Sequence, residues 1–301
     1  MADHHFVPQF YLKGFLDPDS VQTKDPWLWV ANLPAGVVKR RAPKNVAAHA
    51  GYNTVPGSTE SEAAEEVLSQ LETVAAPIIR RLINGANALT GQEWVDLLFF
   101  AAFLAVRTPS FRNRIEGFAA QIAEDLLRLS ASHPDYYHRS VKETAAVEMT
   151  AEEIEASRLT ALTPGAIRIK ARPILSLLAT FQSANDAVYP DFSRMRWAIF
   201  RAEQDLFFVT SDNPVSWADP TSRPAFYAGH GLRMRNVEVV FPVGPQVCLF
   251  GTWNGSAGSL AAPQRLVEAI NRRVLQFSGE EVYANRQELA RAMLLVKARK
   301  P

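Results

Sequence analysis

The chain has 301 residues, of which 48% are hydrophobic and 21% charged, a composition typical of folded globular proteins and unlike that of disordered ones. Its 32 Lys and Arg nearly balance its 31 Asp and Glu, which argues against a protein whose affinity depends mainly on neutralising phosphates, while leaving room for a local basic patch. The single cysteine excludes an intramolecular disulfide, and the lack of a long apolar run or a secretion signal predicts a cytoplasmic protein with no membrane partner.

The first part of the chain predicts a β-hairpin followed by an amphipathic helix. WLWVA and VVKRR are typical of two paired strands near residues 27–42, and LPAG between them is a turn in which Pro34 sets one φ and Gly36 allows a positive one. A capping-box pattern at residues 59–62 precedes apolar residues at helical spacing, which predicts a helix over about 60–84.

The middle of the chain is predicted to be helical. A capping box begins a helix over about 91–130 that is apolar almost all round, which places it in the core, and Pro109 should break or kink it. Residues 130–140 are predicted to form a loop. Thr150 caps a further helix, and another is expected to start at residues 163–164 and to run to about residue 185.

Strands and then helices are predicted for the last third. MRWAIFRA and DLFFVTS indicate two strands joined by a short turn at residues 203–204, and VEVVFPV and QVCLFGTW indicate a second pair. Cys248 lies in this second pair and is expected to be a small buried hydrophobic residue. Two helices follow, one opening at Pro263 and one formed by NRQELARAMLLV.

This order predicts an α+β fold with an N-terminal β-hairpin, a central helical segment, and C-terminal antiparallel-rich strands followed by helices. We expect one domain over residues 1–301. In it, a helical part at about 60–186 is inserted between β-rich parts at 1–57 and 190–301.

The opening stretch MADHHFVPQFYLKGF carries unusual chemistry for a chain terminus. Its four aromatic residues predict that the segment docks on the core and holds His4 and His5 in place. Adjacent residues of an extended chain point to opposite faces, so one histidine can react while the other orients it or faces solvent. The alternative is a packed terminus with a surface histidine pair.

Two further stretches are candidates for a site. In TSDNPVSW, Asp212 and Asn213 either project from a strand end into a pocket or form only a turn that binds local backbone amides. In RTPSFRNR, Arg107 follows an apolar helix and is expected to be buried and paired; alternatively, Arg107 or Arg112 binds a carboxylate or phosphate at two points. Asn271 is expected to bind buried backbone.

Together these stretches resemble a known family. HHFVPQFYLKGF, LWVANLPAGVVKRRAPKNVAAHAGYNTV, FLAVRTPSFR, FFVTSDNPV and AINRRVLQFSGEEVYA occur in an order similar to that of the domain of unknown function 4238 family, found mostly in bacteria. The resemblance implies that the histidine pair, Gln9, Arg107, Asp212 and Asn213 belong to one shared pattern, and we expect them to line one pocket. His49 stands where similar proteins tend to carry an acidic residue.

Three functions follow from these residues. The first is a hydrolase, in particular a metal-dependent nuclease: HHFVP is similar to the start of His-Asn-His nucleases, although such a motif needs a β-hairpin to place the histidine, and only three residues precede His4. A histidine would be the general base, Asp212 would orient it or hold a divalent cation, Asn213 would donate to an oxyanion, and Arg107 would neutralise a phosphate or carboxylate. The second is a non-catalytic binding module for an anionic or nucleotide-like ligand, including nucleic acid. The third is a structural protein in which these groups satisfy one another.

Overall fold

A computed structural model of the chain describes residues 3–54, 60–170, 173–221 and 231–298, and it confirms the α+β fold. The backbone contacts define two compact units. Unit 1 comprises residues 1–110 and 180–301, and unit 2 comprises residues 111–179. The single domain remains a prediction, and the first two long helices, which the sequence places in the central helical part, belong to unit 1.

Unit 1 contains two larger sheets and a short two-stranded ribbon. The five-stranded sheet has the order β10 (Gly258–Ala262), β5 (Arg196–Ala202), β9 (Val247–Thr252), β8 (Glu238–Gly244) and β7 (Ser216–Ala218). The four-stranded sheet has the order β3 (Val37–Arg41), β2 (Leu28–Asn32), β11 (Glu281–Ala284) and β6 (Thr210–Ser211), and the ribbon pairs β1 (Asp3–His5) with β4 (Ala48–Ala50). All neighbouring strands are antiparallel except β10 and β5, so the C-terminal strands are antiparallel-rich as predicted.

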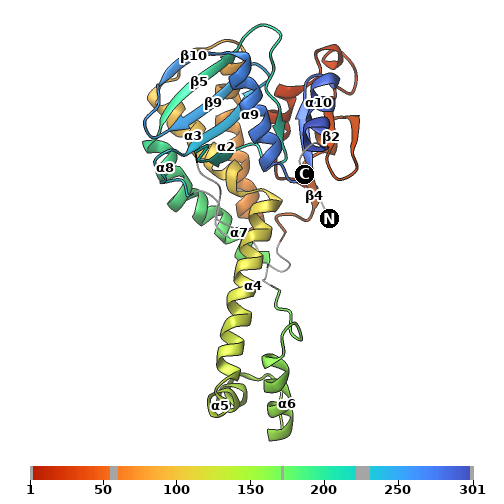
Figure 1. Cartoon of the computed structure of the whole chain (residues 1–301), viewed down its shortest axis with the longest axis vertical. Coiled ribbons are helices and arrows are strands. Elements are labelled where there is room, and N and C mark those ends of the chain that lie inside the picture. The colour runs from red at the N-terminus through yellow and green to blue at the C-terminus, as the bar shows by residue number, and fades with distance from the viewer. Residues whose placement is uncertain (1–2, 55–59, 171–172, 222–230, 299–301) are drawn as a thin grey trace. The chain divides into compact units, whose positions relative to one another are not determined.

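The helices of unit 1 cover the sheets. They are α1 (Gln9–Leu12), α2 (Glu60–Ile83), α3 (Gly91–Val106), α8 (Tyr189–Arg194), α9 (Gln264–Phe277) and α10 (Gln287–Ala298), with short turns at Lys13–Phe15, Pro18–Ser20 and Pro43–Asn45 (η3) and a π-helical turn at Ser183–Val188. Figure 1 shows α2 and α3 behind the strands β10, β5 and β9. The buried face of α9 packs in one cluster with apolar residues of both larger sheets, and α10 packs on β2 and β11.

Unit 2 is helical. It contains most of α4 (Pro109–Ala131), then α5 (Pro134–Thr144), α6 (Ala151–Leu162) and most of α7 (Pro173–Gln182). A small cluster around Tyr137 and Ile154 joins α5 and α6. The predicted loop at residues 130–140 is wrong, because Pro134 occupies the first position of α5, where the missing N–H costs nothing. The predicted helix that runs to about residue 185 is present, but its predicted start at residues 163–164 is wrong: Thr163 caps the end of α6, Gly165 has a left-handed φ of +75°, and α7 begins at Pro173.

Local helix signals elsewhere are confirmed. Thr90 and Glu93 form the predicted capping box of α3, and α4 starts at Pro109 after a break at Arg107. The capping box predicted at residues 59–62 falls partly outside the described residues, although α2 itself is present. In the described part of the chain, no single helix is long and apolar enough to cross a membrane, and only α3 and α4 taken together as a bent pair meet the criteria of length and composition.

The strand pairing of residues 195–211 differs from the prediction. β5 lies between β9 and β10, whereas β6 is reduced to two residues and pairs with β11 in the other sheet. The chain between them leaves the ladder, and Asn271 of α9 replaces the missing hydrogen bonds by accepting from Val209 N and donating to Phe207 O, both at 2.9 Å. The buried backbone role predicted for Asn271 is therefore confirmed, as is the β8–β9 pair that buries Cys248.

Candidate functional site

The ribbon of β1 and β4 fixes the first histidine. His4 lies directly opposite His49 in the antiparallel pair, and its Nδ1 accepts a hydrogen bond from the backbone N–H of Asn53 at 2.9 Å. Because Nδ1 is an acceptor, the proton of the neutral ring lies on Nε2. Glu65 of α2 lies beside this ring, with Oε1 3.7 Å from Nδ1, and it also accepts a hydrogen bond from the amide of Asn53. The hydrogen bond at Nδ1 thus orients the His4 ring, and its N–H lies on Nε2.

The second histidine is bonded differently. The Nε2 atom of His5 is buried and has no hydrogen-bond partner among the described residues. Its backbone carbonyl accepts a hydrogen bond from the guanidinium of Arg107. Buried polar atoms are nearly always hydrogen-bonded, and one that is not calls for a specific explanation. The two adjacent histidines therefore differ: His4 Nδ1 is hydrogen-bonded, whereas His5 Nε2 has no hydrogen-bond partner among the described residues.

Arg107 binds the backbone of this segment. It is 6% exposed and forms an ion pair with Glu72 of α2 at 3.0 Å, which confirms that it is buried and paired. Tyr52 donates a hydrogen bond from its hydroxyl to the Arg107 carbonyl at 2.8 Å. The positive charge is balanced by Glu72, so the guanidinium connects α2 to the backbone of β1. We call His4, His5, Asn53, Glu65, Glu72 and Arg107 the N-terminal histidine site.

The residues after the histidines confirm that this terminus docks on the core. The side chains of Phe6, Tyr11 and Phe15 are buried. The Tyr11 hydroxyl lies 2.6 Å from Thr210 Oγ1 and donates to Pro242 O, so it binds the strand that precedes Asp212. Gln9 begins α1 and is half-buried, and its predicted ligand-binding role remains a prediction.

Asp212 and Asn213 hold the connection between α9 and β11. The Asp212 carboxylate accepts backbone N–H groups from Gly279 at 2.8 Å, Glu280 at 2.6 Å and Glu281 at 3.1 Å. Asn213 donates from Nδ2 to the carbonyl of Phe277, the last residue of α9, at 3.0 Å. Burial raises the pKa of the Asp212 carboxyl, and the three N–H donors counteract this by favouring its ionised form. We call this pair the α9–β11 clamp.

The structure therefore groups the predicted residues in two places within unit 1. His4, His5 and Arg107 share the N-terminal histidine site, whereas the hydrogen bonds of Asp212 and Asn213 go to residues 277–281. Tyr11 connects the two regions through Thr210. A common pocket, and catalytic roles for Asp212 and Asn213, remain predictions.

Arg112 belongs to unit 2, and its predicted ligand-binding role also remains a prediction.

Several residues of the histidine site were not predicted from the sequence. Glu65 and Glu72 are seven positions apart on α2, a spacing that puts both carboxylates on one face of a helix. Two acidic residues on one helix face, together with an arginine expected to be buried and paired, are a sequence signal that could have identified them. Asn53 contributes through its backbone N–H, which no sequence pattern marks.

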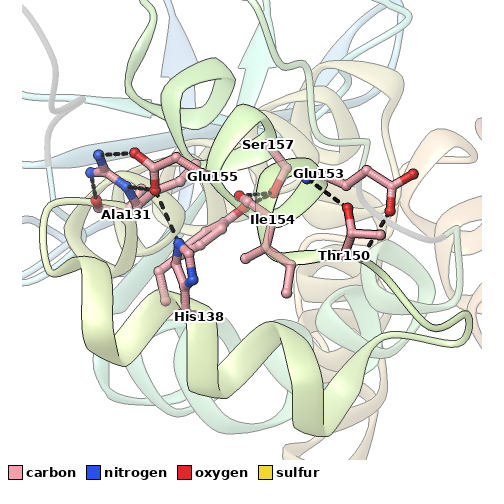
Figure 2. Close-up of polar contacts among 9 residues, drawn as sticks. Ala131, His138, Thr150, Glu153, Ile154, Glu155 and Ser157 are labelled. Carbon is pink, nitrogen blue, oxygen red and sulfur yellow. Dashed lines mark hydrogen bonds and ion pairs between the residues drawn. The ribbon is translucent and has the colours of Figure 1, made fainter.

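Unit 2 has a separate polar group, shown in Figure 2. The Glu155 carboxylate accepts hydrogen bonds from Arg158 at 2.8 and 2.7 Å and lies 3.0 Å from His138 Nε2. These contacts, Arg158 first, lower the pKa of Glu155 from 4.5 to about 2. Across the described ranges of the chain, no group of three or more His, Cys, Asp or Glu side chains is arranged to hold a metal ion.

Residues 3–288 match the model of a family described as protein of unknown function (DUF4238). No curated protein and no solved structure matches the chain.

Proposed function

This chain belongs to the DUF4238 family, and from the geometry of its N-terminal histidine site we propose that it is a hydrolase that cleaves a phosphodiester, as in a nuclease. The observation that carries the proposal is the unequal bonding of two adjacent histidines. His4 Nδ1 is occupied by a backbone N–H, whereas His5 Nε2 is buried without a partner among the described residues.

In this proposal His5 is the general base. In the tautomer with its proton on Nδ1, His5 has a lone pair on Nε2 that can accept a proton from water, and imidazole exchanges protons near neutral pH. The hydrogen bond from Arg107 to the His5 carbonyl holds the backbone at that position, so Arg107 acts as a positioning residue. Its ion pair with Glu72 keeps it in that role.

His4 supplies a hydrogen-bond donor instead. With Nδ1 occupied, its Nε2–H can donate to a phosphate oxygen. The histidines lie in an antiparallel pair, β1 with β4, and α2 follows β4 in the chain. These strands are not consecutive, because β2 and β3 lie between them, so the pair is not the β-hairpin that the His-Asn-His motif needs, and the proposal rests on the bonding of the two histidines.

The test is cleavage by the full chain of labelled single- and double-stranded DNA and RNA, and of a chromogenic phosphodiester, each with Mg²⁺, Mn²⁺, Zn²⁺ or a chelator. We expect cleavage by the wild type and a loss of about 100-fold or more in His5→Gln, the usual contribution of a general base. His4→Gln should lose about 10-fold, and His133→Gln, which changes an exposed histidine of unit 2, should match the wild type.

Two results would overturn the proposal. Equal activity of His5→Gln and the wild type would show that the chemistry lies elsewhere. A wild type that cleaves nothing, yet is thermally stabilised by a nucleotide or another anion, would identify a non-catalytic binding module.

A further inference from the structure

The edge strand β3 carries positive charge that the histidine site does not use. Lys39, Arg40 and Arg41 of β3 and Lys44 of η3 are exposed, and we call them the β3 basic surface. Within the described residues, only Lys44 has an ion pair, with the exposed Asp25 at 3.2 Å. Although the whole chain is nearly neutral, four basic residues lie within residues 39–44, and one acid, Asp25, pairs with one of them.

A hollow in this surface brings the charge together with aromatic rings. Its volume is about 430 Å³, and it is lined by Asp25, Trp27, Arg40, Arg41, Ala42, Lys44 and Asn45. The Arg40 guanidinium lies over the rings of Trp27, 5.0 Å from the centroid, and Trp29, 5.8 Å from the centroid. Trp29 stands opposite Arg40 in the β2–β3 register, and its Nε1 donates to Asp17 at 2.5 Å. The arrangement is therefore built into the hairpin.

This arrangement leaves the arginine free to bind an anion. Arg40 is held by aromatic faces and not by a carboxylate, so its N–H donors remain available for phosphate oxygens. Proteins that bind single strands generally combine two features. A basic groove follows the phosphate backbone, and aromatic and guanidinium planes beside it stack on the bases. An anionic lipid has no bases to stack on the aromatic and guanidinium planes of the hollow.

We propose that the β3 basic surface binds the backbone of single-stranded nucleic acid. The proposal deepens the proposed function by naming its substrate class. It rests on the proposed function only in treating the bound strand as a substrate, because binding itself does not require cleavage. The chain runs from η3 directly into β4, where His49 lies opposite His4, so a bound strand would lie one short segment from the histidines.

The test measures binding of a fluorescein-labelled single-stranded oligonucleotide by fluorescence anisotropy, in the presence of chelator, as a function of salt. We expect Arg40→Gln with Arg41→Gln to weaken binding about 10-fold or more at low salt. The slope of log K against log salt should fall by about 1.4, or about 0.7 for each phosphate that is no longer neutralised. Arg40→Lys with Arg41→Lys should keep the slope. The control, Arg194→Ala with Arg196→Ala, removes two exposed charges elsewhere in unit 1 and should change affinity less than twofold.

The outcomes distinguish the failure of this binding proposal from the failure of the proposed hydrolase activity. His5→Gln should bind like the wild type even though it does not cleave, and binding should quench tryptophan fluorescence in the wild type but less in Trp27→Phe. The proposal is overturned if the Gln pair binds like the control pair in a folded protein. It is also overturned if duplex DNA or anionic vesicles bind as tightly as the single strand with the same salt slope, or if the wild type binds no single strand at low salt.

Discussion

Replacing Asp212 by alanine tests whether this residue is a structural clamp. Its carboxylate accepts three backbone N–H groups, from Gly279, Glu280 and Glu281. It is 9% exposed, so the truncated side chain would leave these donors without their acceptor. A Cβ at Gly279 would lie 3.0 Å from Asp212 Oδ2, which shows how closely the backbone approaches the carboxylate.

The size of the loss follows from the exposure of the three donors. A hydrogen bond to a charged group contributes about 1.5–3 kcal/mol, and less where water can replace the lost partner. Glu281 is half-buried in β11, while Gly279 and Glu280 are exposed. Counting about 2 kcal/mol for the first and about 0.5 kcal/mol for each of the others gives about 3 kcal/mol. Removing the buried charge, whose desolvation raises the pKa of Asp212, offsets part of this, so the expected loss is below about 3 kcal/mol.

The measurement is the free energy of unfolding in urea, followed by circular dichroism. Asp212→Asn keeps one acceptor oxygen and should lose about 1 kcal/mol. The control Asp205→Asn changes an exposed aspartate at a φ of +66°, which asparagine also adopts, and should stay within about 0.5 kcal/mol of the wild type. A loss below about 0.5 kcal/mol in Asp212→Ala would refute the clamp. So would a drop of about 100-fold in cleavage by folded Asp212→Asn, which would instead support the predicted catalytic role.

Three further predictions follow from other parts of the structure. Arg107→Ala should lower the free energy of unfolding by about 3 kcal/mol, because it leaves the partly buried His5 carbonyl and the Glu72 carboxylate without their partner; a loss below about 0.5 kcal/mol in urea denaturation would contradict this. The Glu155 carboxyl should titrate at about 2 by NMR, and in Arg158→Ala its midpoint should rise toward 4.5. Since this folded pKa is lowered, the stabilisation is present above 4.5 and lost as the pH falls through about 2. Burial raises the pKa of the Cys248 thiol to about 12, so a thiol reagent should react with it only after unfolding, and an equal rate in native protein would be inconsistent with its burial.

Features set by neighbouring residues could be predicted from the sequence. The β2–β3 hairpin follows from alternating strands around a turn with Gly36 at a φ of +65°, and the start of α3 follows from the Thr90 capping box. The burial of Arg107 could be expected because it ends an apolar helix. In each case the physical cause lies within a few residues of the feature.

Features that depend on distant partners could not be predicted. β6 pairs with β11, more than sixty residues later, and not with β5, its neighbour in the chain. The α9–β11 clamp also depends on distant residues. From the sequence Asp212 could equally be a turn residue, and only the fold brings the backbone N–H groups of residues 279–281 to its carboxylate. The histidine pair could be identified from its residue types, but its division into a bonded ring and a free one depends on Asn53 and could not.

The hydroxyl of Tyr11 has a consequence for the order in which the protein can assemble. It binds Thr210 of the four-stranded sheet and Pro242 of the five-stranded sheet, which follow it by 199 and 231 positions. Contacts of such separation form late, because a long loop must close before they stabilise anything. The segment around Tyr11 therefore reaches its final place only after strands that follow it by about 200 residues or more have folded. Until then the aromatic side chains beside the histidines remain exposed to water and to other chains in the cell.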